Sequence, residues 1–179
     1  MKKFTNKIMI LLVLGVLAIS ASVVNAAPPE PQRMMEKVRK ELVTLPYYGV
    51  FDNLEYKVDG STVTLFGQVR NPSTRHDAER RIAKIEGVDR VVNNIEVLPV
   101  SGFDDSIRVR TYRAVFRSGS LYRYSLGANP SIHIVVKNGR VTLEGVVSSK
   151  MDSQLAYMAA NGVPGVFAVT NNLRIASHS

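Results

Sequence analysis

The residues best suited to acid–base chemistry or metal binding lie far apart in this sequence. The three histidines are His76, His133 and His178, and none has a carboxylate or a second histidine at ligand spacing. His133 alternates with Ile132 and Ile134, which predicts an exposed position on the polar face of a strand. No serine lies in a nucleophile elbow and no glycine lies in a phosphate loop. We therefore expect no enzyme, no catalytic residue, no metal site and no cofactor.

Arginine and aromatic side chains gather in the segment from Phe103 to Tyr124, which has helical spacing. Arg110, Arg113 and Arg117 fall at positions i, i+3 and i+7, so they share one narrow stripe of a helix. Such a stripe suits an anionic lipid surface, because each basic group near the surface contributes about 1 kcal/mol and aromatic rings lie well at the head-group level. The candidate lipid-binding residues are Arg110, Arg113, Arg117, Tyr112, Phe116 and Arg123.

Two apolar strips flank this arginine stripe and leave two interpretations open. One strip, with Ile107 and Thr111, can face the sheet of its own domain. The other, with Tyr112 and Phe116, either meets lipid beside the arginines or packs against the first half of the chain, with the arginines as a solvated rim. The corresponding helix of the first half mixes acidic and basic residues, so binding is expected in the second half.

An internal repeat indicates which elements must position these side chains. Shifted by 78 residues, VTLFGQV from Val63 aligns with VTLEGVV from Val141, and GVDRVVNNIEV from Gly87 aligns with GVFAVTNNLRI from Gly165. Eleven identities at one offset identify a tandem duplication. The signature that recurs in both copies includes Gly67, Gly87, Asn93, Gly145, Gly165 and Asn171.

Each copy shows the pattern of a helix, a β-hairpin, a second helix and a last strand. Apolar and charged residues alternate from Leu54 to Val58, which predicts a half-buried strand. Asn138 and Gly139 predict a tight hairpin turn, and Asn71 with Pro72 predicts a helix start. The first helices are expected from Met34 to Leu45 and from Ile107 to about Tyr124, and the last strands at 91–97 and 169–175.

The resulting fold class is α+β, with two tandem α-β-β-α-β modules. Each module is expected to be a three-stranded mixed sheet with two helices on one face. We expect the second helix to cross the sheet at Gly67 and Gly145, since a glycine inside a strand indicates a close approach. The paired asparagines near each last strand are expected to serve the backbone.

The first residues have the pattern of a secretory signal peptide. Lys2, Lys3 and Lys7 precede an apolar run at 8–24, and an A-x-A-like site ends at Ala26. Cleavage after Ala26 would export the protein, and an uncleaved anchor is the alternative. The predicted divisions are a signal peptide at 1–26, a flexible segment at 27–33, and modules at 34–99 and 103–176.

The charge and the lack of cysteine limit the possible partners. Without cysteine there is no disulfide, no thiolate metal site and no lipid anchor on an N-terminal cysteine. After removal of three signal lysines, 20 basic residues stand against 15 acidic ones, a net charge of +5. This charge favours anionic head groups or cell-wall polymer, and export argues against nucleic acid.

The repeated residues also resemble a known family. The V-T-L-x-G-x-V strand, the alanine-bearing helix and the G-V-x-x-V-x-N-x-L/I ending are similar to the BON domain, named after bacterial osmotic-stress and nodulation proteins. The resemblance covers nearly the whole mature chain. It implies a periplasmic setting, a role in phospholipid binding or envelope maintenance, and no catalytic activity. Some relatives are lipoproteins, so this cysteine-free chain would need surface affinity to reach a membrane.

These observations predict an exported, non-enzymatic envelope protein of the periplasm, peripheral to a membrane. Its second module is expected to bind anionic phospholipid and to support envelope integrity or osmotic-stress tolerance. The alternative is an interaction adaptor for an envelope protein or a cell-wall assembly. The oligomeric state, and whether the two modules form one rigid body, stay open at this point.

Overall fold

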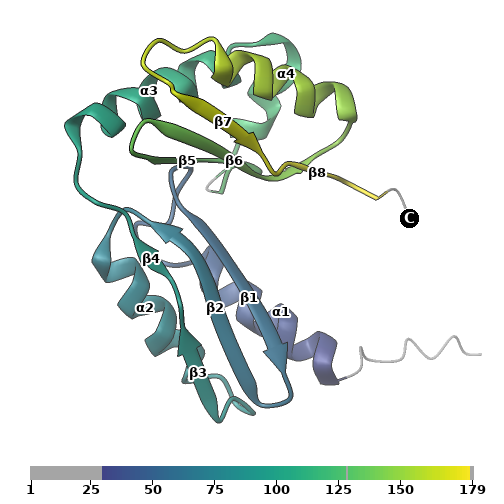
Figure 1. The fold of residues 1–179 in the computed structure, drawn as a ribbon. Coiled ribbons are helices and arrows are strands. Elements are labelled where there is room, and N and C mark those ends of the chain that lie inside the picture. Colours follow the sequence, from purple (N-terminus) through teal and green to yellow (C-terminus); the bar gives the residue numbers. More distant parts are fainter. Residues whose placement is uncertain (1–29, 128, 178–179) are drawn as a thin grey trace, which may run out of the picture.

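The computed structural model describes residues 30–127 and 129–177. The predicted signal peptide, the first part of the predicted flexible segment and His178 lie outside the described residues. The chain forms two modules, and each has helices on one face of a small sheet (Figure 1). The predicted α+β class and the order of elements are confirmed.

The two modules repeat the same elements, with one addition in the second. Module one contains α1 (Glu30–Val43), β1 (Asn53–Asp59), β2 (Thr62–Val69), α2 (Pro72–Ile82), β3 (Arg90–Asn93) and β4 (Glu96–Val97). Module two contains α3 (Gly102–Phe116), the 3₁₀ helix η1 (Gly119–Ser125), β5 (Ile132–Lys137), β6 (Arg140–Val147), α4 (Lys150–Asn161), β7 (Ala168–Asn171) and β8 (Arg174–Ile175).

The first helices begin earlier than expected. Helix α1 starts at Glu30, inside the segment predicted to be flexible, and an ion pair of 2.8 Å between Glu30 and Arg33 stabilises its first turn. Helix α3 starts at Gly102, where the hydroxyl of Ser101 accepts a hydrogen bond from the backbone N–H of Asp104. It ends at Phe116, and the chain continues as a 3₁₀ helix from Gly119.

The last strand of each module is broken into two short segments. Strands β3 and β4 both run parallel to β2, and β7 and β8 both run parallel to β6. At the first break the Asn93 side chain accepts a hydrogen bond from the Ile95 N–H and donates to the Arg75 carbonyl on α2. Asn171 makes the equivalent contacts with Leu173 and Ser153. The asparagines therefore link helix and sheet through backbone groups.

The strand glycines are required by the neighbouring strand. A Cβ at Gly67 would lie 2.1 Å from the Asn53 carbonyl oxygen, and one at Gly145 would lie 2.1 Å from the Ser131 oxygen. Both glycines also have positive φ, +105° and +117°. The prediction that the second helix crosses there is wrong, because the chain entering the first strand of each hairpin makes this close approach.

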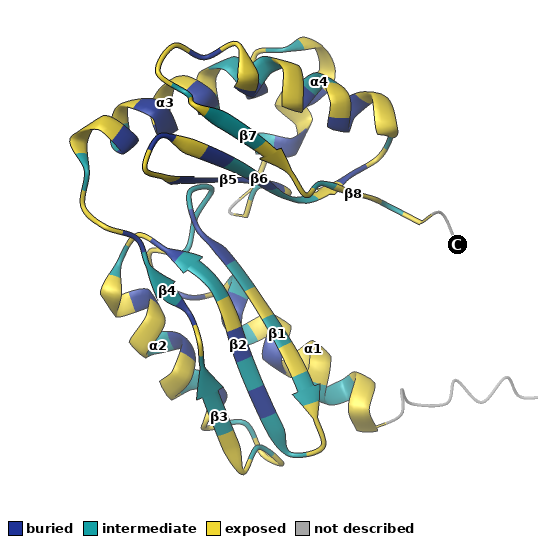
Figure 2. Ribbon diagram, in the orientation of Figure 1, coloured by how far each residue is buried: buried dark blue, intermediate teal, exposed yellow. Residues whose placement is uncertain are grey.

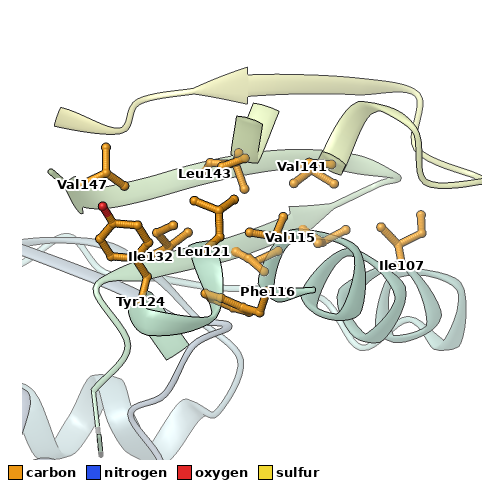
Figure 3. Packing of buried hydrophobic residues seen from close by; sticks show 13 residues of the cluster. Ile107, Val115, Phe116, Leu121, Tyr124, Ile132, Val141, Leu143 and Val147 are labelled. Carbon is orange, nitrogen blue, oxygen red and sulfur yellow. The ribbon is translucent and has the colours of Figure 1, made fainter. Parts of the chain in front are cut away.

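Each module has its own hydrophobic core between its helices and its sheet (Figure 2 shows the buried residues on the inner faces). In module two, residues of α3, η1, β5 and β6 fill the core, with Leu121 and Leu143 fully buried (Figure 3). On α4 the buried residues include Ala156 and Ala160, whereas Met158 is 61% exposed.

The modules contact each other at the outer edge of β5. The Ile134 N–H donates a hydrogen bond of 2.7 Å to the Val50 carbonyl of module one. The Tyr48 ring stacks on His133, with 5.4 Å between the ring centroids. Ion pairs join Lys137 to Glu96 and Arg70 to Asp105 across the same boundary.

This contact corrects the prediction for His133. The side chain does lie on the face of β5 away from the helices, but it is only 9% exposed, because the loop before β1 covers it. Burial raises the pKa of Tyr48 to about 12 and lowers the pKa of His133. The face of β5 that carries His133, which the sequence pattern predicts to be exposed, therefore forms an interface between the modules.

Candidate functional site

The candidate surface is carried by helix α3, whose start is fixed to the hairpin of module two. The buried carboxylate of Asp104 accepts hydrogen bonds from the backbone N–H groups of Asn138, at 2.9 Å, and Gly139, at 2.8 Å. The next turn is held by Arg108, which is 3% exposed and donates to the Val136 carbonyl at 2.6 Å. Because Asp104 and Arg108 bind the β5–β6 hairpin, the opposite side of the helix is turned to solvent.

The three arginines of the predicted stripe lie on this exposed side. Arg110, Arg113 and Arg117 are all exposed, and the Arg110 Nε donates to the Ser106 carbonyl at 3.2 Å, along the helix. Within residues 30–127 and 129–177 none of the three arginines forms an ion pair. Figure 1 shows α3 and α4 on the side of the module-two sheet away from module one.

The predicted aromatic members of the site are not exposed. Phe116 is 6% exposed and belongs to the core of module two (Figure 3). The half-buried Tyr112 lies 4.8 Å from Phe116 and 6.1 Å from Phe51 of module one, measured between ring centroids. The prediction that Phe116 faces lipid is wrong, because this ring lies in the core of module two. Tyr112 is turned toward Phe51 in the loop of module one. The alternative interpretation, packing against the first half of the chain, is correct for Tyr112.

Arg123 lies apart from the stripe and binds its own module. Its guanidinium donates to the Asp152 carboxylate at 2.7 Å and to the Tyr124 hydroxyl at 2.9 Å. That hydroxyl donates in turn to Asp152. Hydrogen bonds from Ser149, Tyr124 and Arg123 hold the pKa of Asp152 below its usual value. Arg123 thus connects η1 to the start of α4 and is not free in the way that the three stripe arginines are.

Two exposed phenylalanines, one at the start of α3 and one in the loop after α4, were not among the predicted site residues. Phe103 is 49% exposed and Phe167 is 71% exposed, with 5.9 Å between their ring centroids. Phe103 precedes Arg110 by seven residues and so belongs to the same stripe of α3. This spacing could have identified Phe103 from the sequence alone. Phe167 follows α4 in a loop, and only the fold brings it to Phe103.

The described residues contain no cluster of metal-ligating side chains: within 30–127 and 129–177 there is no group of three His, Cys, Asp or Glu side chains that could hold a metal ion. His76 is exposed on α2, in the other module from His133. In the same part of the chain no helix is both long enough and apolar enough to span a bilayer.

Comparison with known proteins agrees with the repeat. The model of the BON domain matches residues 35–99 and again residues 104–177. The chain belongs to the BON-domain family. Its two BON domains coincide with modules one and two, and helix α3 is the first helix of the second BON domain.

No curated protein matches the chain. Among solved structures it is similar to the C-terminal domain of CdsD, the structural protein of the type III secretion system of Chlamydia trachomatis, with 11% identity and a TM-score of 0.33 over 80% of this chain and 98% of that one. A second structure of CdsD gives 11% identity and a TM-score of 0.31, over 81% and 94%. Scores this low carry no argument about architecture or function.

Proposed function

We propose that this tandem-BON protein is an exported, non-enzymatic protein of the periplasm whose second BON domain docks on anionic phospholipid. In this role it supports envelope integrity under osmotic stress. The observation that carries the proposal is the row of Arg110, Arg113 and Arg117, exposed on one side of α3 and without ion-pair partners in the described residues.

The size of the expected effect is sufficient for reversible docking. Three basic groups near an anionic surface contribute about 3 kcal/mol together, or about a hundredfold in affinity. Because the groups are exposed, salt near physiological concentration should screen their attraction to the surface at distances beyond about 8 to 10 Å. The bound state should therefore be peripheral and salt-sensitive.

The helices of the first BON domain also carry exposed basic side chains, but several of their arginines are paired with carboxylates. Arg33 pairs with Glu30, and Arg81 lies 3.6 Å from Glu41. Arg80 also pairs with Asp77, one turn away on α2. These carboxylates on α1 and α2 reduce the attraction of the neighbouring arginines to anionic lipid. This difference supports the assignment of docking to the second domain.

The test is flotation of the mature protein with vesicles of phosphatidylcholine alone or with added phosphatidylglycerol. We expect binding that rises with the phosphatidylglycerol fraction. Binding should fall as salt is raised from about 50 to 500 mM, because the Debye length then shortens from about 14 to 4 Å. Binding that is indifferent to lipid charge and to salt would contradict the proposal.

A second function is favoured by a different observation. Phe66 is 39% exposed on the sheet face of module one that carries no helix. Aromatic side chains are enriched in protein–protein interfaces, so this ring is the candidate contact for a protein partner on that face. If the wild-type protein binds no vesicle but is retained by a defined envelope protein, and Phe66→Ala abolishes that retention, the adaptor function replaces lipid docking.

A further inference from the structure

Two exposed aromatic rings form one corner of the second BON domain. Phe103 lies in the first turn of α3, and Phe167 lies in the loop between α4 and β7. Their exposed fractions are 49% and 71%, and their centroids are 5.9 Å apart. We call Phe103, Phe167 and the adjoining turn at Asn138 and Gly139 the aromatic corner. Single exposed rings are common on protein surfaces, but two rings in contact form an apolar patch.

The aromatic corner is supported by rigid backbone. The Phe167 N–H donates to the Gly139 carbonyl at 2.9 Å. A Cβ on Gly139 would lie 2.5 Å from the Phe167 ring, so the ring lies directly against the turn. The same turn is bound by the buried carboxylate of Asp104, one residue after Phe103. The rings are thus held in place although they are not buried.

The first BON domain shows that the fold does not need an aromatic residue here. At the position equivalent to Phe167 it has Asp89, whose N–H donates to the Ser61 carbonyl at 2.9 Å. The same backbone hydrogen bond therefore forms with a charged side chain in one domain and an aromatic one in the other. The apolar patch is a property of the second domain alone.

Cationic groups lie beside the rings. The Arg110 Nη2 and the Phe103 Cζ are each 3.5 Å from the position that a Cβ on Gly165 would occupy, so guanidinium and ring flank the same glycine. Arg140 follows the turn and is exposed. Aromatic rings next to guanidinium groups match the layer of a bilayer in which acyl chains end and phosphates begin. Guanidinium groups bind phosphate with two parallel hydrogen bonds.

We propose that the aromatic corner enters the interfacial layer of an anionic bilayer and sets the orientation of the second BON domain on the membrane. The inference rests on the proposed function and adds a point of insertion to it. Arg110, Arg113 and Arg117 supply the salt-sensitive attraction, and the two rings supply contact with the acyl-chain boundary. The side of α3 that carries the arginine stripe then lies along the membrane, with the first turn of the helix inserted into it.

The chain contains no tryptophan, so a single introduced indole reports on its own surroundings. In the full mature chain, Phe167→Trp places the reporter in the aromatic corner, and Asp89→Trp places it at the matched position of the first domain. With phosphatidylglycerol vesicles we expect a blue shift and quenching by acyl-brominated lipid for Phe167→Trp. We expect neither for Asp89→Trp, although both variants float with the vesicles.

A second variant separates insertion from attraction. Phe103→Ala combined with Phe167→Ala should weaken vesicle binding about tenfold and leave its salt dependence unchanged. Because both rings are exposed, the unfolding transition should stay close to that of the wild type.

The failures of the two proposals can be told apart. If Phe167→Trp floats with anionic vesicles but shows no shift and no quenching, the inserted corner is refuted and docking through the arginines stands. Equal quenching of Asp89→Trp also refutes the defined orientation. If the wild-type protein does not float, the proposed function and the insertion fail together.

Discussion

At the scale of single residues, the strand glycines have the strictest steric requirement. Gly145 combines a φ of +117° with a neighbouring carbonyl 2.1 Å from the position of a Cβ. Gly60 also has a positive φ, +58°, but nothing lies within 4 Å of its Cβ position. Substitutions at these two glycines therefore distinguish the energetic cost of backbone strain from that of a steric clash.

We predict that Gly145→Ala lowers the free energy of unfolding by about 3 kcal/mol or more, since the strand must move or distort. Gly60→Ala should lower it by about 1 to 2 kcal/mol, the cost of the left-handed conformation alone. Urea unfolding followed by circular dichroism measures both. Equal losses of unfolding free energy in the two variants would show that the clash of an added Cβ with the Ser131 carbonyl costs nothing.

At the scale of the element, helix α3 carries aromatic residues of two kinds. Phe116 lies in the core, whereas Phe103 lies on the exposed stripe. Their sequence surroundings are similar, since each stands one to three residues from apolar and charged neighbours. Only the packing of α3 against β5 and against the loop of module one distinguishes them.

For this helix we predict that Phe116→Ala lowers the free energy of unfolding by about 3 to 5 kcal/mol through the cavity it leaves. Phe103→Ala should lower it by less than about 1 kcal/mol. Thermal unfolding of the two variants provides the comparison, and a larger loss for Phe103 than for Phe116 would contradict the assignment of the two faces.

The arrangement of elements was predictable from the repeat, because two copies of each pattern support one another. The turn at Asn138 and Gly139, with φ of +52° and +74°, and the cap at Asn71 lie where residue type alone places them. Helix starts were less predictable, since Glu30 and Gly102 precede the apolar periodicity on which the predictions were based.

The candidate site was predictable only in its charged part. The spacing of Arg110, Arg113 and Arg117 shows that they share a stripe, and the structure places that stripe in solvent. Charge alone does not predict this exposure, since Arg108 of the same helix is buried. The burial of His133, however, depends on how one module docks on the other, and that of Phe116 depends on the packing of the module-two core. The sequence pattern of one element does not contain that information. The pairing of Phe103 with Phe167 likewise arises from tertiary structure across 64 residues of chain.

At the scale of the whole molecule, the contact between the modules contains a buried histidine, His133. His133 stacks on Tyr48 and lies 3.3 Å from the Gly49 carbonyl, with the Asp52 carboxylate nearby. Burial lowers the pKa of His133 from its usual value, although Gly49 and Asp52 oppose the shift. Burial also raises the pKa of Asp52 and of Glu144, which faces Glu55 of module one.

The sign of the pH effect follows from these directions. Because the pKa of His133 is lower in the folded state, its neutral form stabilises the docked modules above about pH 6.5, and this contribution is lost as pH falls through the folded-state pKa. Protonation of Asp52 and Glu144 acts in the opposite direction, but in the carboxylate range at lower pH.

We predict that wild-type protein unfolds at lower urea concentration as pH falls below about 6.5 and that His133→Gln lacks this part of the pH dependence. Urea midpoints at a series of pH values test the prediction. Parallel profiles for wild type and variant would mean that His133 does not couple protonation to the contact between modules.

The most direct test of lipid docking compares two triple variants with equal loss of charge. The first variant removes the stripe of α3 through Arg110→Ala, Arg113→Ala and Arg117→Ala. The second removes three exposed charges of module one through Arg39→Ala, Lys40→Ala and Lys84→Ala. Binding to phosphatidylglycerol vesicles should fall about a hundredfold for the first variant and much less for the second. Equal losses in the two variants, or none in the first, would contradict docking through the second BON domain.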